Sequence, residues 1–285
     1  MISYRNLLSE YEEKCIENGV YEGNALNYLL ELTQKNRVDL YCDIDCEVSE
    51  VFLSEYKKGM QRILNHEPVQ HVVGYSWFYG YKILVNKDVL IPRPETEELV
   101  SNILSKMDNY FERDKIKNIV DIGTGSGAIA IALAKEEANC KVYASDISDE
   151  ALVVAKENAL VNDADITFMS GDMLEPFIEK NLKFDVLISN PPYIPQAETL
   201  EKSVKDFEPH VALFGGDDGL KFYENIFENC HKILNDKAFM AFEIGYNQAS
   251  SLKALFNKFY PDKKVEIIKD MNDKDRMLFV EMEKK

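Results

Sequence analysis

The feature that most constrains the fold is a regular alternation of short apolar segments and helical segments, which runs from Pro94 onward. Short apolar strands that alternate with helices are typical of an α/β protein with a parallel, doubly wound sheet covered on both faces. Helical segments separate the first five predicted strands, but not the last two, which we expect to form an antiparallel pair. The predicted strands span residues 118–122, 141–145, 166–170, 184–189, 238–244, 265–268 and 277–281.

The first 65 residues carry a different pattern, in which apolar side chains recur at helical spacing in three stripes. Gly19 is expected to end the first helix, and Ser49 to cap the third. Glu67-Pro68 interrupts the helical pattern, and residues 72–85, rich in aromatic and β-branched side chains, predict a β-hairpin. The expected division is an N-terminal helical partner-binding domain (1–72), a β-hairpin linker (73–92) and an α/β domain (93–285).

Composition narrows the class of protein. Acidic residues outnumber basic ones by 50 to 33, for a formal charge of −17. Proteins that bind nucleic acid through its phosphates usually present a basic face, so this balance favours a protein or small-molecule partner. The sequence shows no run of 18 apolar residues and no secretory signal, so we expect no membrane span and a cytoplasmic protein. We also expect a monomer. Five scattered cysteines and four dispersed histidines predict no metal site.

A glycine-rich loop follows the first predicted strand of the α/β domain. Glycines let the backbone turn sharply and approach a ligand closely, although a merely tight turn would use the same residues. The loop lacks a Gly-Lys-Ser/Thr ending, which argues against a phosphate-binding P-loop. With Asp121 before it, the G-x-G-x-G order resembles the first motif of class I methyltransferases, where the loop passes the amino-acid part of S-adenosylmethionine. The loop consists of Gly123, Thr124, Gly125, Ser126 and Gly127.

Acidic residues follow the next two predicted strands. Asp146 ends the second strand, where a carboxylate can accept hydrogen bonds from both ribose hydroxyls of a nucleoside. The alternative is that Asp146 caps the following helix, but Asp149 is better placed for that role. After the third strand, the same resemblance implies that Asp172 meets the adenine amino group and that Met173 lines the ring.

The fourth predicted strand delivers Asn190, Pro191, Pro192 and Tyr193 at its carboxyl end. An amide nitrogen is a poor nucleophile because its lone pair is delocalised into the carbonyl. Acceptors beneath its NH₂ group favour a pyramidal geometry, and the Asn190 side-chain oxygen and the Pro191 carbonyl can supply them. Pro191 and Pro192 restrict the backbone, and Tyr193 offers a flat face for a planar group. Unless it is an ordinary proline turn, this tetrapeptide predicts methyl transfer to a planar amide or amine nitrogen, driven by alignment rather than by a general base.

Further motifs make the resemblance more specific. They span residues 67–74, 90–97, 121–130, 189–194, 208–209, 212–213 and 215–220. Together they resemble the peptide chain release factor glutamine methyltransferases over about residues 65–285. The resemblance implies a class I, Rossmann-like methyltransferase domain (93–285) that methylates N5 of the glutamine in the Gly-Gly-Gln motif of class I release factors, with S-adenosylmethionine as donor. It implies the tetrapeptide as catalytic site, and the glycine loop, Asp146, Asp172, Met173 and Asn190 as cofactor site.

Three alternatives remain open. A ribosomal-protein glutamine methyltransferase would use the same chemistry, although residues 93–97 fit the release factor group better. A DNA adenine-N6 methyltransferase would use the same tetrapeptide, but the acidity and the small N-terminal domain argue against it. A scaffold would bind the cofactor without turnover, and would not require Asn190 or Tyr193.

Residues 93–98 lie near the junction between the hairpin and the α/β domain. Thr96 is expected to cap the helix that follows, because Glu97 and Glu98 would then occupy its first turn. We expect Arg93 to pair with an acid such as Glu97 and so to order the entrance to the site.

Overall fold

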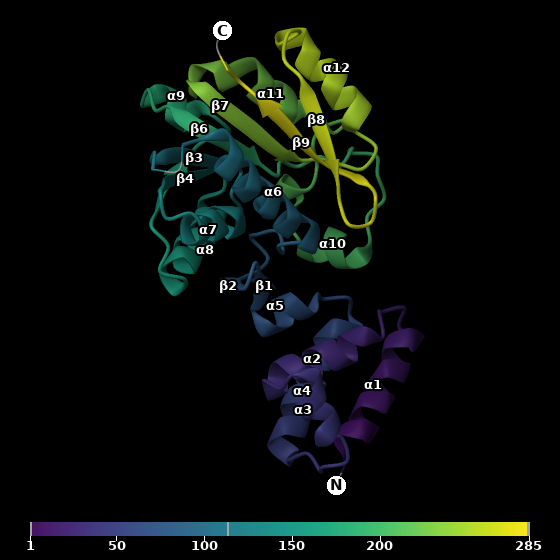
Figure 1. Ribbon diagram of the computed structural model, residues 1–285. Coiled ribbons are helices and arrows are strands. Elements are labelled where there is room, and N and C mark those ends of the chain that lie inside the picture. Colours follow the sequence, from purple (N-terminus) through teal and green to yellow (C-terminus); the bar gives the residue numbers. More distant parts are fainter. Residues whose placement is uncertain (1, 113, 284–285) are drawn as a thin grey trace. The chain divides into compact units, whose positions relative to one another are not determined.

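The computed structural model describes residues 2–112 and 114–283, which divide into two compact units (Figure 1). The first unit comprises the described residues up to Tyr75, together with residues 200–207. The second unit comprises the described residues of 76–199 and 208–283, and it contains the main sheet. Each unit has its own hydrophobic core.

The first unit is built from helices around the buried side chain of Tyr56, whose hydroxyl donates a 3.0 Å hydrogen bond to the Ala25 carbonyl. The Ser49 hydroxyl accepts a hydrogen bond from the Phe52 amide, which confirms the predicted cap. Three short helices, α3, α5 and α10, add to the three that were predicted. The helices of this unit are α1 (Tyr4–Glu17), α2 (Gly23–Thr33), α3 (Arg37–Cys42), α4 (Glu50–Leu64), α5 (Val69–Val73) and α10 (Lys202–Phe207).

The β-hairpin begins later than the sequence predicts. Its strands are β1 (Tyr75–Phe78) and β2 (Tyr81–Leu84), because α5 continues to Val73. Gly74 ends α5 with a φ of +84°, a left-handed conformation that glycine adopts without steric cost. The β-branched residues at the end of α5 favour a strand by propensity, but their side chains pack against the helical core of the first unit instead.

The second unit contains a seven-stranded sheet with the order β5-β4-β3-β6-β7-β9-β8. Strands β3 to β7 are parallel, and β9 pairs antiparallel with both β7 and β8. The predicted doubly wound sheet and its antiparallel end are confirmed. The strands are β3 (Lys117–Ile122), β4 (Cys140–Asp146), β5 (Ile166–Ser170), β6 (Phe184–Ser189), β7 (Leu234–Glu243), β8 (Val265–Lys269) and β9 (Asp275–Glu281).

Helices cover both faces of this sheet, because alternate residues of each strand point to opposite faces. In the central strand β6, Val186 and Ile188 join the core of one face and Leu187 joins that of the other. The first face is covered by α6 (Pro94–Tyr110), α7 (Ala128–Glu136) and α8 (Asp149–Val161). The second face is covered by α9 (Glu175–Glu179), α11 (Lys221–Asn229) and α12 (Ala249–Phe259).

The strand order reverses between β3 and β6. From β3 the chain continues to β4 on one side, whereas β6 pairs with β3 on the other side. Ile122 and Ser189 are direct partners in the register, so Gly123 and Asn190 leave the sheet from adjacent carboxyl ends. Open α/β sheets bind ligands at such a point, because the loops that follow the two strands separate and leave a crevice.

Candidate active site

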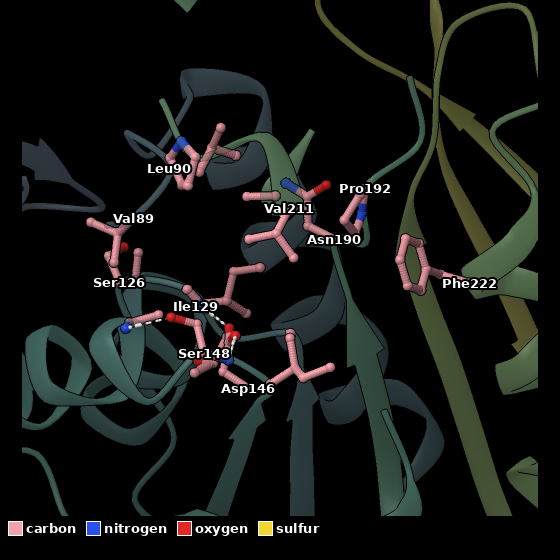
Figure 2. Close-up of a pocket in the computed structure, with 18 of the residues that line it drawn as sticks. Val89, Leu90, Ser126, Ile129, Asp146, Ser148, Asn190, Pro192, Val211 and Phe222 are labelled. Carbon is pink, nitrogen blue, oxygen red and sulfur yellow. Dashed lines mark hydrogen bonds between the residues drawn. The ribbon is translucent and has the colours of Figure 1, made fainter. Parts of the chain in front are cut away.

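A pocket of about 370 Å³ lies at this reversal point, within the second unit (Figure 2). Its walls come from the loops that follow β3, β4, β5 and β6, from the segment that leads into α6, and from the start of α11. Figure 2 shows Asp146 and Ser148 on one wall and Asn190 beside Pro192 on another. A concave site of this size is suited to a small-molecule ligand.

Most of the predicted site residues meet in this pocket. Those that line it are Gly123, Thr124, Gly125, Ser126, Asp146, Asp172, Met173, Asn190 and Pro192. Gly127, Pro191 and Tyr193 are not among the described residues that line it. The structure thus divides the predicted set into residues on the pocket wall and residues that support the wall.

The glycines of the loop have two different structural roles. Gly123 and Gly125 line the pocket with φ angles of +71° and +55°, and a Cβ at either position would meet no atom within 4 Å. Their backbone therefore faces open space. Gly127 precedes α7 with a φ of +81°, and a Cβ there would lie 3.2 Å from the Cβ of Ala155 on α8. Gly127 accordingly permits close helix packing.

Asp121 supports the glycine loop from the end of β3. Its carboxyl group is fully buried, and its Oδ2 accepts a 2.6 Å hydrogen bond from the Thr124 hydroxyl. Burial raises the pKa of Asp121 to about 7, although the hydrogen bond from Thr124 acts in the opposite direction. The conformation of the loop is therefore tied to a buried carboxyl group.

Asp146 lies at the end of β4 and contacts both neighbouring segments. Its Oδ2 accepts a 2.8 Å hydrogen bond from the Gly125 amide, and its Oδ1 accepts a 3.0 Å bond from the Ser148 amide. Burial raises the pKa of Asp146, and these backbone hydrogen bonds oppose the shift. The expectation that Asp149 caps the next helix is wrong: α8 begins at Asp149, and the Ser148 hydroxyl accepts from the Ala151 amide.

Asp172 and Met173 occupy a tight turn after β5. Met173 has a φ of +47°, which is uncommon for a residue with a side chain. Its carbonyl accepts a 3.2 Å hydrogen bond from the Ser145 hydroxyl, which anchors the turn to β4. A Cβ on Gly171 would lie 2.9 Å from Pro176 Cδ, so only glycine fits before the turn. These contacts place Asp172 and Met173 in the pocket wall.

Tyr193 is held by its surroundings at both its side chain and its backbone. Its hydroxyl donates to Glu243 Oε1 over 3.4 Å, and its carbonyl accepts a 3.1 Å hydrogen bond from Gln248 Nε2. The same Gln248 amide group donates to the Gly219 carbonyl, and its Oε1 accepts from the Gly245 amide. Burial raises the pKa of Tyr193, so its phenol stays protonated. Tyr193 therefore anchors the tetrapeptide to β7 and to the segment that follows it.

Thr96 does not cap α6, contrary to expectation. The helix begins at Pro94, and Thr96 lies inside its first turn with 4% of its surface exposed. Its hydroxyl donates a 2.6 Å hydrogen bond to Glu243 Oε2, and its oxygen accepts from Asn190 Nδ2 at 3.5 Å. The signal for this placement is Pro94, because proline favours the first position of a helix. Glu243 carries no comparable signal in the sequence.

Arg93 pairs with Glu208 rather than with the predicted Glu97. Its Nη2 lies 2.5 Å from Glu208 Oε1, and Glu208 Oε2 accepts a 3.2 Å hydrogen bond from the Ile91 amide. The Glu208 side chain is 1% exposed and that of Arg93 is 36% exposed. The pair joins two segments of the pocket wall, and a sequence separation of 115 residues puts the partner beyond any spacing rule.

Over residues 2–112 and 114–283, no group of three His, Cys, Asp or Glu side chains is arranged to hold a metal ion. Among the helices of the same described residues, none is both long and apolar enough to cross a membrane.

Comparison with known families identifies both parts of the chain. Residues 99–214 match the family described as Methyltransferase small domain, and residues 8–74 match the PrmC N-terminal domain. A solved structure of a methyltransferase from Pyrococcus furiosus covers 80% of this chain and 100% of its own, with a TM-score of 0.55 and 19% identity. At this identity, the likeness establishes the fold.

Proteins of similar sequence indicate a narrower family. The release factor glutamine methyltransferase of Bacillus cereus is 43% identical over 269 residues, which are 94% of this chain and 95% of the relative. That of Staphylococcus aureus is 38% identical over 280 residues, which are 98% of this chain and 99% of the relative. These matches confirm the resemblance that the motifs predict, and the chain belongs to the release factor glutamine methyltransferase family.

Proposed function

We propose that this protein transfers a methyl group from S-adenosylmethionine to the side-chain amide nitrogen N5 of the glutamine in the Gly-Gly-Gln motif of class I release factors. The observation that carries the proposal is that the glycine loop and Asn190 meet in one pocket, at the adjacent ends of β3 and β6. The names of the relatives support the choice of substrate.

The residues of the pocket fit S-adenosylmethionine. Gly123 and Gly125 present bare backbone to open space, so the amino-acid part of the cofactor can pass close to them. Each carboxylate oxygen of Asp146 accepts one backbone hydrogen bond and retains a lone pair for a ribose hydroxyl. Asp172 and Met173 would meet the adenine. When bound, this cofactor supplies a methyl group on a positively charged sulfur, which is already activated for transfer.

The tetrapeptide would orient the substrate amide. In this proposal the Asn190 Oδ1 and the Pro191 carbonyl accept the two N–H groups, so the nitrogen lone pair points toward the methyl group. Pro191 does not line the pocket, but it lies between Asn190 and Pro192, which do. Both prolines restrict the backbone that carries these acceptors. Alignment supplies the catalysis, and the amide nitrogen loses its proton to water after the methyl group is transferred, so no side chain has to remove a proton before the attack.

We propose residues 1–72 as the partner-binding domain, residues 73–92 as the hairpin linker and residues 93–285 as the methyltransferase domain. In the first unit, Tyr21, Val38 and Val51 expose between 71% and 79% of their surfaces, so they can be changed without disturbing its core. Replacing each with serine should raise the KM for an intact release factor if its position lies in the docking face. The KM for a short Gly-Gly-Gln peptide should stay unchanged, and equal KM values for the two substrates in the wild type would contradict docking.

The experiment that tests the proposed reaction uses labelled S-adenosylmethionine with unmethylated release factor, ribosomal proteins and DNA in parallel. Label on the Gly-Gly-Gln glutamine, lost with Asn190→Ala, supports both the substrate and the mechanism. Label on a ribosomal protein or on DNA would overturn the substrate, and bound cofactor without transfer to any acceptor would indicate a scaffold.

A further inference from the structure

A short chain of hydrogen bonds runs behind the proposed catalytic amide. Asn190 Nδ2 lies 3.5 Å from Thr96 Oγ1, which in turn lies 2.6 Å from Glu243 Oε2. Thr96 and Glu243 are 4% and 2% exposed, so neither side chain depends on solvent for its hydrogen bonds. Asn190 lies on the pocket wall beside Pro192 (Figure 2), and the largely buried Thr96 borders the same pocket. The chain of hydrogen bonds therefore connects a buried carboxylate to the Asn190 amide on the pocket wall.

The chemistry of the three groups sets the direction of these hydrogen bonds. Glu243 accepts from the Tyr193 hydroxyl through Oε1 and from the Thr96 hydroxyl through Oε2, so the single hydroxyl hydrogen of Thr96 is donated to Glu243. The Thr96 oxygen then has only lone pairs to offer to Asn190. The part of the Asn190 side chain that faces Thr96 must accordingly be its NH₂ group, and its Oδ1 is turned to the other side.

Such control matters because the two ends of an asparagine amide are almost the same size. Shape alone does not decide between its two orientations, which differ by a half-turn, and only hydrogen-bond partners do. With the half-turn, Asn190 would present NH₂ to the NH₂ group of the substrate, and two donors would oppose each other. The correct orientation presents an acceptor.

We infer that Thr96 and Glu243 are positioning residues that set the orientation of the Asn190 amide, so that its oxygen faces the amide nitrogen to be methylated. This inference rests on the proposed function for the identity of the acceptor, but not for the orientation itself. The Tyr193 hydroxyl, 3.4 Å from Glu243 Oε1, contacts the same carboxylate, so Glu243 serves two members of the tetrapeptide.

The cost of burying the carboxylate supports a specific role. Glu243 lies buried at the end of β7, where a charge is strongly unfavourable unless it has partners, and here the Thr96 and Tyr193 hydroxyls and the positive charge of Arg276 supply them. Burial raises its pKa, and the hydrogen bond from Thr96 opposes that shift. If the contact only braced α6 against β7, a pair of apolar side chains would serve as well or better.

The kinetic test compares two substitutions at position 96. Thr96→Val keeps the shape of the side chain but removes the hydroxyl, whereas Thr96→Ser keeps the hydroxyl. We expect Thr96→Val to lower kcat about tenfold or more, by analogy with other preorganised hydrogen bonds, with little change in KM or cofactor affinity. Thr96→Ser should restore most of the rate. Equal loss in both variants, or a wild-type kcat for Thr96→Val, would overturn the inference.

Glu243→Gln supplies a second variant of almost unchanged volume. Its amide can donate to Thr96, which frees the hydroxyl hydrogen to turn toward Asn190. We expect kcat to fall as in Thr96→Val, again with cofactor affinity retained. A wild-type rate for this variant would show that the charge of Glu243 does not set the orientation.

A direct readout separates this inference from the proposed function. In protein labelled with ¹⁵N-asparagine, the Asn190 side-chain NH₂ protons should show a nuclear Overhauser effect to the Thr96 methyl group, and Glu243→Gln should weaken it. If the wild-type protein transfers no methyl group to the release factor but shows the nuclear Overhauser effect, the proposed substrate is rejected and the positioning role is kept. Absence of the effect in the wild type would reject the positioning role whatever the substrate is.

Discussion

The loops that follow β3 and β6 leave the sheet side by side, yet they are built on opposite principles. The loop after β3 presents backbone: Gly123 and Gly125 adopt left-handed conformations and face open space. The loop after β6 presents the side chain of Asn190, which is held through Thr96 by the buried Glu243. One wall of the pocket depends on the absence of side chains, and the other depends on a network of them.

This difference follows from what each wall is proposed to contact. A bulky cofactor requires room and main-chain polar groups, which glycine supplies within a few adjacent residues. An acceptor aimed at a single nitrogen requires a fixed direction, which takes partners from several elements. We therefore expect substitutions in the first loop to change binding and substitutions behind the second loop to change rate.

The largest effect is expected at Asn190. Asn190→Ala should lower kcat by about 100-fold or more, because it removes an aligned acceptor from the reacting group. The dissociation constant for S-adenosylmethionine, measured by calorimetry, should change much less. A variant that loses cofactor affinity and rate in equal proportion would show that the two walls are not separable.

A substitution in the glycine loop should act on binding instead. Gly125→Val places a branched side chain at a φ of +55° on the pocket wall, and we expect cofactor affinity to fall about tenfold or more. Gly74→Val is the matched control, because it creates comparable backbone strain at a φ of +84° outside the pocket. If both variants bind the cofactor equally well, the loop does not contact it.

A substitution at Gln248 tests how much the anchoring of the loop after β6 contributes to kcat and to stability. Gln248→Glu keeps an acceptor for the Gly245 amide but removes the donor to the carbonyls of Tyr193 and Gly219. We expect a several-fold lower kcat and a loss of about 1–3 kcal/mol in the free energy of unfolding, because buried carbonyls lose their partner. Chemical denaturation and steady-state kinetics measure the two effects. An unchanged kcat would mean that Asn190 holds its position without this anchor.

The smallest effect is expected at Asp121, and it concerns stability. Its folded-state pKa of about 7 lies above the ordinary value of 3.8, so the folded protein binds the extra proton between these values. The contribution of Asp121 to stability therefore falls as pH rises from about 4 to about 7. Asp121→Asn, which cannot ionise, should gain a few degrees in Tm relative to the wild type between pH 5 and pH 8. A constant difference in Tm would show that burial does not raise this pKa.

Local sequence accounts for many of the elements, and the exceptions have physical reasons. Period and composition predict the strand of residues 184–189 with its observed bounds, since a strand buried on both faces is a continuous apolar run. The hairpin is predicted too early, because Val72 and Val73 favour a strand by propensity and yet pack in a helix on the first core. The cap of α8 is misplaced by one residue, because serine and aspartate are both good caps.

The residues of the candidate site also fall into two groups, those that local sequence predicts and those that only the tertiary structure brings together. The glycine loop, Asp146 and the tetrapeptide are contiguous or follow predicted strands, so the sequence alone determines that they gather at the carboxyl edge of the sheet. Arg93 with Glu208, and Thr96 with Glu243, join residues that are more than a hundred positions apart. Those pairs exist only because β7 and the segment after the tetrapeptide return to α6, and no local pattern encodes such a return. The sequence thus specified which candidate groups meet at the pocket, and the tertiary structure decided which buried partners hold them in place.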